Sequence, residues 1–86
     1  IDEYVALINK LRAAGAPIDV AGIQGHVGRQ VREPADVLSD LDRLAATGLE
    51  IQISEFDINS PDEELQADYT RDFLIALYSH PSVTGF

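Results

Sequence analysis

Four polar residues at the ends of two apolar segments carry the groups in this sequence that are best suited to chemistry. Glu55 and Asp57 end one segment, and Gln24 and His26 end an earlier one. Carboxylates beside an imidazole can act as nucleophile, general acid or general base, or can hold a divalent metal ion. These four residues are therefore the candidate site.

The parity of the residues indicates which side chains can meet. Two sets of residues share a parity within their segments, and an extended chain points each set to one face. The sets are Gly22, Gln24 and His26, and Leu49, Ile51, Ile53, Glu55 and Asp57. Adjacent parallel strands lie about 4.8 Å apart, so we expect one hydrogen-bonded cluster of His26, Glu55 and Asp57. In that cluster both carboxylates orient the imidazole.

A second interpretation makes Glu55 and Asp57 ordinary charges at a strand exit, where they cap the following turn. A carboxylate deep at a strand end is costly to desolvate unless partners hold it. Because His26 and Gln24 supply such partners at the same depth, the cluster is favoured. Phe56 has the opposite parity and should pack outward against helices, unless a local bulge turns it toward the site.

Helices and strands alternate around these residues. Three stretches have apolar residues at helical spacing and end at residues that break helices. Their apolar residues are Tyr4, Leu7, Ile8 and Leu11; Val37, Leu38, Leu41, Leu44 and Ala45; and Leu65, Tyr69, Phe73, Leu77 and Tyr78. Buried parallel strands are predicted over 18–27 and 49–58, with a loop over 28–33, and a third strand begins near residue 82.

Particular residues mark the ends of the helices. Pro34 should lie in the first turn of the second helix. Ser60 should cap the third helix, with Pro61 in its first turn and Glu63 completing a capping box. His80 is expected to cap the carboxyl end of that helix, favoured by the helix dipole. We assign the helix aromatic residues to the core and give them no site role.

The alternation predicts an α/β fold with parallel strands. Its repeat of roughly 30 residues is the βαβ unit. Parallel strands need cover on both faces, so the chain is interpreted as a slice of a (β/α)8 TIM barrel of about 250 residues. The alternative is an open flavodoxin-like domain, which usually shows a phosphate-binding glycine loop. Gly22, Gly25 and Gly28 do not match that spacing.

Composition limits the classes of partner. The 86 residues make at most one small domain, and they include no Cys for a disulfide or a thiolate site. Six basic against fifteen acidic residues give a formal charge of −9, which makes nucleic acid a poor partner. The apolar runs are far shorter than the ~20 residues that cross a bilayer, and no segment resembles a signal peptide. No membrane partner is expected, and a neutral ligand fits this surface.

The sequence resembles glycoside hydrolase family 10, the retaining endo-1,4-β-xylanases, in six segments that follow one another along the whole chain. They are Pro17-Ile18-Asp19, Gly22-Ile23-Gln24-Gly25-His26, Thr47-Gly48-Leu49, Ile53-Ser54-Glu55-Phe56-Asp57-Ile58, Gln66-Ala67-Asp68-Tyr69 and His80-Pro81-Ser82-Val83-Thr84-Gly85-Phe86. The resemblance implies that residues 1–86 are a partial catalytic domain, from the fifth helix to the start of the eighth strand of the barrel.

The resemblance also implies a role for each candidate residue. Glu55 matches the catalytic nucleophile, and His26 and Asp57 match the residues that hydrogen-bond around it and keep it ionised and aimed. Gln24 and His26 match a Gln-x-His pattern that lines the sugar subsites. Val27 stands where many relatives carry an aromatic residue or leucine. Neither a metal nor a cofactor is implied.

The implied activity of the intact protein is hydrolysis of internal β-1,4 bonds in xylan or xylo-oligosaccharides. Retention needs a second carboxyl group about 5.5 Å from the nucleophile. The family's acid/base glutamate follows an asparagine, and this sequence has no Asn-Glu dipeptide and no Trp. The chain alone is therefore expected to be inactive and to self-associate through open sheet edges. The resemblance further implies secretion.

Two other functions remain open. One is a metal-dependent barrel hydrolase or isomerase, with His26, Glu55 and Asp57 as ligands. The other is a saccharide-binding or assembly module that keeps a barrel-like site without turnover. Bound metal would identify the first, and sugar binding without hydrolysis would identify the second.

Overall fold

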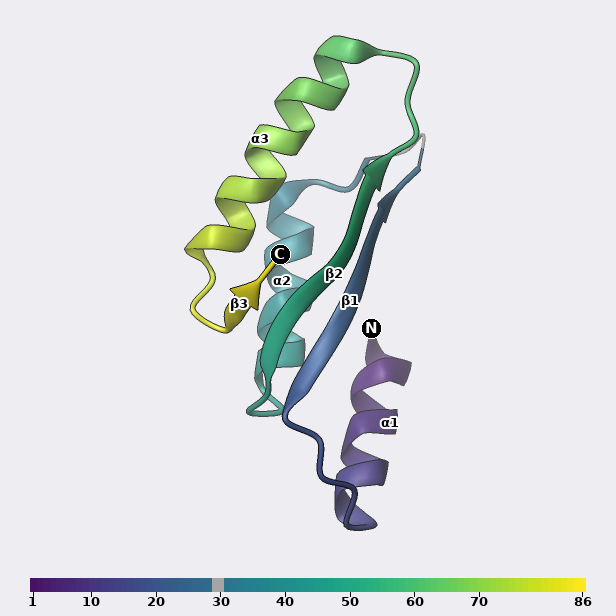
Figure 1. The fold of residues 1–86 in the computed structure, drawn as a ribbon, viewed down its shortest axis with the longest axis vertical. Coiled ribbons are helices and arrows are strands. Elements are labelled where there is room, and N and C mark those ends of the chain that lie inside the picture. The colour runs from purple at the N-terminus through teal and green to yellow at the C-terminus, as the bar shows by residue number, and fades with distance from the viewer. Residues whose placement is uncertain (29–30) are drawn as a thin grey trace.

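The structure is a computed structural model that describes residues 1–28 and 31–86. The elements are α1 (Asp2–Ala13), β1 (Val20–Val27), α2 (Pro34–Ala45), β2 (Glu50–Ile58), α3 (Glu63–Ser79) and β3 (Val83–Gly85) (Figure 1). Their order and approximate bounds confirm the predicted alternation. The predicted loop over 28–33 includes residues 29 and 30, which lie outside the described residues.

The three strands form one parallel sheet in the order β1–β2–β3. Because β2 lies between its two neighbours, β1 and β3 are the edge strands of the described sheet (Figure 1). β1 and β2 are each followed by a helix that returns the chain to the starting end of the next strand. The chain is therefore two consecutive βαβ units, and the predicted α/β class is confirmed.

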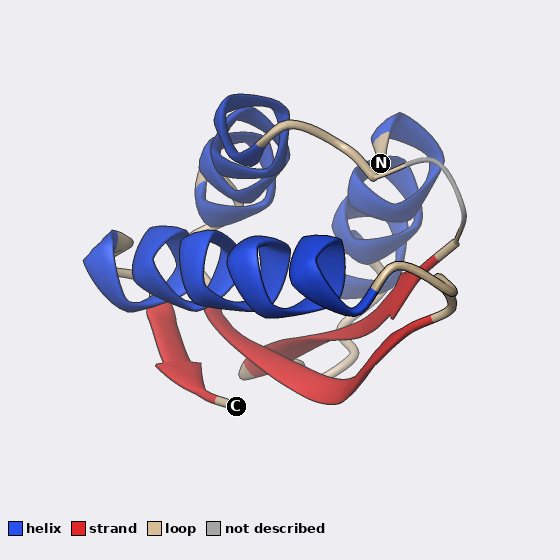
Figure 2. Cartoon of the chain, turned by 90° about the horizontal axis from the view of Figure 1, so that it is seen from above, coloured by secondary structure: helices blue, strands red, loops and turns tan. Residues whose placement is uncertain are grey.

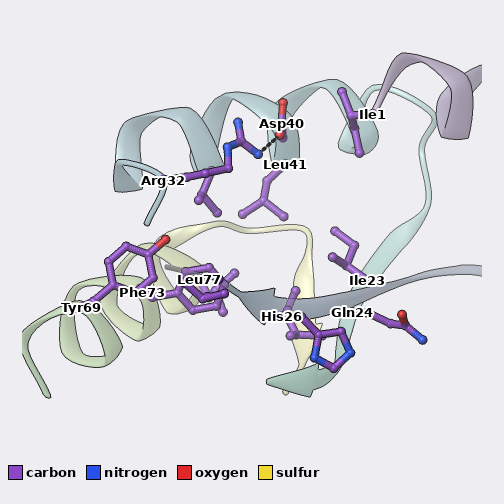
Figure 3. A pocket seen from close by; sticks show the side chains of 15 residues that line it. Ile1, Ile23, Gln24, His26, Arg32, Asp40, Leu41, Tyr69, Phe73 and Leu77 are labelled. Carbon is purple, nitrogen blue, oxygen red and sulfur yellow. Dashed lines mark hydrogen bonds and ion pairs between the residues drawn. The ribbon is translucent and has the colours of Figure 1, made fainter. Parts of the chain in front are cut away.

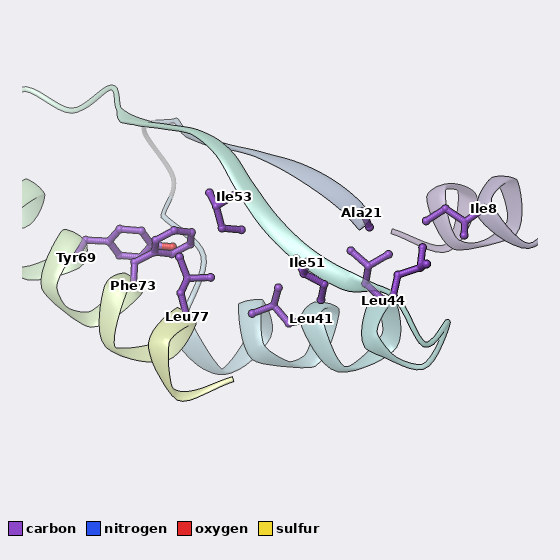
Figure 4. Close-up of a cluster of buried hydrophobic side chains, with 10 residues drawn as sticks. Ile8, Ala21, Leu41, Leu44, Ile51, Ile53, Tyr69, Phe73 and Leu77 are labelled. Atoms are coloured by element: carbon purple, nitrogen blue, oxygen red, sulfur yellow. The ribbon is translucent and has the colours of Figure 1, made fainter. Parts of the chain in front are cut away.

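The helices all lie on one side of the sheet, and the core fills the space between them and the strands (Figures 2 and 4). Leu44 and Ile51 are fully buried there. The buried core residues are Ile8, Ala21, Leu41, Leu44, Leu49, Ile51, Ile53, Tyr69, Phe73 and Leu77. The prediction that the strands are buried on both faces is wrong for the described chain, because alternate residues of β1 and β2 on the second face are exposed.

Two glycines end the first two helices as the sequence predicts. Gly15 has a φ of 93° and Gly48 a φ of 83°, values in the left-handed region that favours glycine. Pro34 occupies the first turn of α2, where its missing N–H costs no hydrogen bond. These local signals set the lengths of α1 and α2.

The start of α3 differs from the prediction. The N-cap is Asp62, whose Oδ1 accepts a hydrogen bond from the backbone N of Leu65 at 3.0 Å. Ser60 instead accepts a hydrogen bond from the backbone N of Asp62 at 3.2 Å, one turn before the helix. A carboxylate is as good an N-cap as a hydroxyl and also interacts favourably with the helix dipole, so the cap falls two residues later than expected.

Three residues of the predicted apolar stripes are exposed. Tyr78 on α3 is 78% exposed, and Leu7 and Leu11 on α1 are 51% and 42% exposed. Their helical spacing is regular, but no described element covers those faces of the helices. Tyr69 and Phe73 are buried in the core as predicted. Helical periodicity thus identified the helices correctly and overestimated their buried faces.

His80 lies at the C-cap of α3, as predicted, but its ring does not bond the last carbonyls of the helix. Its Nδ1 accepts a hydrogen bond from the backbone N of Ser82 at 3.1 Å, and its Nε2 lies 2.9 Å from Oδ1 of Asp42 on α2. The side chain is only 6% exposed. An amide N–H can only donate, so Nδ1 carries no proton and Nε2–H donates to Asp42. The ring therefore needs no positive charge to cap this end.

The parity predicted for β2 is wrong, because the strand contains a bulge. The pairing of β1 with β2 shifts between Ile23–Ile53 and Gln24–Glu55, and leaves Ser54 unpaired. After Ser54 the faces exchange, so Glu55 and Asp57 lie on the open face, opposite to Ile53. Phe56 packs toward the helices as predicted, with its ring centroid 5.1 Å from that of Phe73.

Candidate active site

The candidate residues lie together at the carboxyl ends of two adjacent parallel strands. In the register of the sheet, Gln24 pairs with Glu55 and His26 pairs with Asp57. All four side chains are on the open face, because the bulge brings the β2 carboxylates into phase with Gln24 and His26 on β1. The sequence placed these residues together correctly, although it assigned the wrong face to Glu55 and Asp57.

The imidazole of His26 joins the two carboxylates. Its Nε2 lies 2.9 Å from Oε2 of Glu55, and its Nδ1 lies 2.8 Å from Oδ2 of Asp57. Gln24 Nε2 donates to Oε1 of Glu55 at 3.1 Å. We call these four residues the carboxylate–histidine cluster. Each oxygen of Glu55 thus has one polar partner and keeps lone-pair capacity for another atom.

The two carboxylates favour the charged form of the ring. The hydrogen bond and the negative charge of Asp57 are the main reasons why the pKa of His26 is raised above 6.5. Glu55 contributes in the same direction, and partial desolvation opposes them. A protonated ring donates from both nitrogens, which matches an acceptor at each end.

The cluster is open to a ligand. The side chains of His26, Glu55 and Asp57 are 48%, 49% and 63% exposed. An open hollow of about 570 Å³ adjoins His26 and Asp57, and its other lining residues are Val27, Gly28, Ile58 and Asn59. Its position beyond the strand ends is where a substrate reaches the chemistry of a parallel-strand barrel.

A second cavity, of about 370 Å³, lies on the helix side of β1 between apolar side chains of the sheet, α2 and α3. Figure 3 shows Leu41, Tyr69 and Phe73 around this cavity, whereas the side chains of Gln24 and His26 extend to the other side of β1. Gln24 and His26 border the cavity where β1 passes it, but Glu55 and Asp57 do not. The cavity is therefore separate from the candidate chemistry.

The nitrogen and oxygen atoms of the cluster do not point to one common position that a metal ion could occupy. Residues 1–28 and 31–86 contain no group of three or more His, Asp and Glu side chains placed to hold one. His26 contacts Glu55 and Asp57 through opposite ring nitrogens, so the two carboxylates lie on different sides of the ring. The arrangement suits orientation of a carboxylate by hydrogen bonds better than metal ligation.

Ser54 is the residue near the cluster that the sequence reasoning missed. Its Oγ donates to the backbone O of Ile23 at 3.3 Å, across the place where the pairing shifts. The sequence does contain a signal for the bulge. Apolar residues occupy 51 and 53 and then 56 and 58, so the phase of the apolar pattern changes at Ser54.

The fold and the cluster together define a class of protein, an α/β chain with polar groups at the carboxyl ends of parallel strands, as in (β/α)8 barrel enzymes. The described part of the chain has no helix long and apolar enough to span a membrane. The model of glycosyl hydrolase family 10 matches residues 1–86. The chain belongs to glycosyl hydrolase family 10 and carries part of its (β/α)8 barrel.

Individual relatives agree with the family. The chain is 37% identical over 84 residues to endo-1,4-beta-xylanase 2 of Arabidopsis thaliana, which covers 98% of the chain and 8% of that protein. It is 39% identical to the anti-sigma-I factor RsgI6 of Acetivibrio thermocellus, over 98% of the chain and 11% of that protein. A beta-1,4-xylanase of Dictyoglomus thermophilum is 40% identical over 62% of the chain and 15% of its own length. The chain thus spans at most about a seventh of these relatives.

Proposed function

We propose that the full-length protein is a retaining endo-1,4-β-xylanase in which Glu55 is the nucleophile. Membership of the family supports hydrolysis of xylan or xylo-oligosaccharides, and the geometry supports the choice of Glu55. This carboxylate is half exposed at a strand end, and His26 and Gln24 each hold one of its oxygens. The main support for the proposal is that an accessible carboxylate has a polar partner at each of its two oxygens.

The proposed reaction has two displacements. Glu55 attacks the anomeric carbon of a xylose unit while a second carboxylic acid protonates the departing glycosidic oxygen, and a covalent glycosyl–enzyme forms. Water, deprotonated by that second group, then attacks the same carbon and releases Glu55. Because the attacking and acid groups of a retaining enzyme lie about 5–5.5 Å apart, we propose that the acid comes from another strand of the barrel.

His26 and Asp57 orient Glu55 in this proposal. The protonated ring donates to the Oε2 of Glu55 from one side and is fixed by Asp57 from the other. Orientation of this kind lowers the barrier because the attacking oxygen is already aimed before the substrate reacts. Gln24 completes the hold and extends the polar surface toward the sugar.

The 86-residue chain alone is proposed to be nearly inactive. The edges of β1 and β3 expose unpaired backbone groups within the described sheet, so the isolated chain should self-associate. Family usage supports secretion of the full-length protein. The charge of −9 on these 86 residues supports a neutral polysaccharide rather than nucleic acid as the partner.

Trapping of the covalent intermediate tests the nucleophile. A 2-fluoro xylobioside with a dinitrophenyl leaving group needs no acid catalyst for departure, so it reports on the attacking carboxylate alone. Intact mass of the full-length protein should increase by one glycosyl group, and peptide mapping should place it on Glu55. Labelling of the 86-residue chain in parallel would show that the half-site forms by itself.

The matched variants are Glu55→Gln and Glu50→Gln, two glutamates on the same strand. Glu55→Gln should abolish labelling and xylan hydrolysis, and Glu50→Gln, at the opposite end of β2, should leave both unchanged. Labelling at another carboxylate of the folded protein, or no labelling at all, overturns the assignment of Glu55.

A second candidate function is recognition of a saccharide without turnover. One relative of comparable identity is named as an anti-sigma-I factor and not as a xylanase, which supports a role without turnover. Under this alternative, the full-length protein binds xylo-oligosaccharides and shows no hydrolysis, and binding survives Glu55→Gln. Measurable hydrolysis by the unmutated protein, lost in Glu55→Gln, eliminates it.

A further inference from the structure

The bulge at Ser54 separates β2 into two parts with opposite faces. Up to Ile53, the helix side of β2 receives the buried residues Ile51 and Ile53. Beyond Ser54 the helix side receives Phe56 and Ile58, which pack against the core. One extra residue thus moves the next carboxylate to the open face.

Regular alternation would give an unfavourable arrangement. If Ser54 were paired in a regular ladder, Glu55 and Asp57 would point into the apolar core behind Ile53, and Phe56 would point to the open face. Burial of two carboxylates away from polar partners is strongly unfavourable. The contact of Phe56 with Phe73 would also be lost. The bulge therefore serves the core and the cluster at the same time.

Two contacts hold the bulge against β1. Ser54 Oγ donates to the backbone O of Ile23, the last residue before the pairing shifts. On the other side of the shift, the backbone O of Glu55 lies so close to Gly25 that a Cβ there would be 2.8 Å from it. The side-chain hydrogen bond spans the interruption of the ladder, and the close approach fixes the strands just beyond it.

From these contacts we infer that Ser54 is a positioning residue, whose hydroxyl fixes the bulge and thereby the direction of Glu55 and Asp57. Only the test by kcat rests on the proposed function. Ser54 does not face the ring of His26 and acts through the backbone of Glu55. A displacement of about 1 Å at a reacting group can cost on the order of 10²-fold in rate, so a small change at the bulge should be measurable.

Ser54→Thr and Ser54→Val form the matched test in the full-length protein, because Thr and Val have nearly the same shape and differ in the hydroxyl. Ser54→Thr should keep the wild-type kcat on an aryl xylobioside. Ser54→Val should lower kcat by about fivefold or more, the factor that corresponds to the loss of one neutral hydrogen bond. KM should change little, since the polar groups that bind sugar remain.

The titration of His26, followed by NMR, gives a readout that a loss of stability alone does not move. In Ser54→Val the pKa of His26 should fall toward 6.5, because both carboxylates that raise it are displaced. Ser79→Ala is the control, since Ser79 also donates its hydroxyl to a backbone carbonyl, that of Ala76, far from the cluster. It should change neither kcat nor the pKa of His26.

The inference is overturned if Ser54→Val keeps both the wild-type kcat and the raised pKa of His26. If the protein hydrolyses no xylan, the proposed function fails, while the titration of His26 still tests the role of Ser54 independently.

Discussion

The two histidines of the described chain both contact carboxylates, yet their surroundings differ in almost every other respect. His26 is half exposed at a strand end and has a carboxylate at each ring nitrogen. His80 is buried at a helix end and has Asp42 at one nitrogen and a backbone N–H at the other. The backbone donor requires an unprotonated Nδ1 in His80, whereas two acceptors favour the doubly protonated ring in His26. The partners, more than the residue type, therefore separate a structural histidine from one in a candidate site.

The largest difference between the two histidines should appear in the activity of their alanine variants. His26→Ala in the full-length protein removes the group that aims Glu55, so kcat on xylo-oligosaccharides should fall by about 10²-fold or more. In alkali, where the charge of His26 is lost, the denaturation midpoint should hardly change, because the His26 side chain is 48% exposed. Steady-state kinetics and urea denaturation on the same preparation measure both quantities. Full activity in His26→Ala would remove it from the proposed machinery.

His80→Ala should show the reverse pattern. The substitution leaves a cavity and an unsatisfied backbone N–H at Ser82, and we expect a loss of about 2 kcal/mol in the free energy of unfolding. His80→Asn is the control, because an asparagine side chain can accept the N–H two residues ahead in the same way and should recover part of the loss. Equal destabilisation by both variants would show that the hydrogen bond to Ser82 is unimportant.

The two carboxylates around His26 should have unequal effects on its ring. NMR titration should give a pKa above 6.5 for His26 in the unmutated protein, and Asp57→Asn should lower it more than Glu55→Gln does. The reason is that the hydrogen bond and charge of Asp57 are the larger causes of the shift. A larger decrease in Glu55→Gln would reverse the assignment of the main partner.

The same shift predicts a pH dependence of stability. Since the pKa of His26 is raised on folding, its contribution is fully present below about 6.5, the ordinary value, and is lost as pH rises through the folded-state pKa. The difference in denaturation midpoint between the unmutated protein and His26→Gln should therefore be largest in acid and vanish in alkali. A difference that grows with rising pH would contradict a raised pKa.

The smallest effect is expected at the partner of His80. Asp42→Asn keeps an acceptor oxygen for Nε2, and the Asp42 side chain is 75% exposed. The free energy of unfolding should therefore change by about 0.5 kcal/mol or less. Thermal unfolding of the full-length protein measures this change. A loss comparable with that in His80→Ala would mean that the charge of Asp42, rather than its hydrogen bond, holds this helix junction.

Local signals in the sequence were sufficient for the elements and for the members of the cluster. Glycines and prolines marked the ends of α1 and α2, and the strand-end positions of His26 and Glu55 predicted that they would meet. These features depend on neighbouring residues and on the geometry of parallel strands, both of which can be read from spacing. Membership of the family was likewise predicted from the quoted segments and is confirmed by the match over residues 1–86.

The sequence predictions that were wrong share a different cause. The bulge at Ser54 exists because it buries Phe56 and exposes Glu55, a balance that depends on what the helices present to the strand. The choice of Asp62 over Ser60 as N-cap and the exposure of Tyr78 likewise depend on how α3 lies against its neighbours. Strict alternation and helical periodicity describe one element at a time, so they do not include the energy of packing between elements.

The attachment of α1 has a consequence for the order in which the structure opens. Ile8 is the only buried residue of this helix. The other described links of α1 to the strands and loops include the hydrogen bonds of Tyr4 to Gly22 and of Arg12 to Thr47. A segment with little buried apolar surface opens at a lower free energy than the core. In the described chain, the amide protons of α1 should therefore exchange with solvent well before those of Ile51 and Gln52 on β2, which pair with a strand on each side.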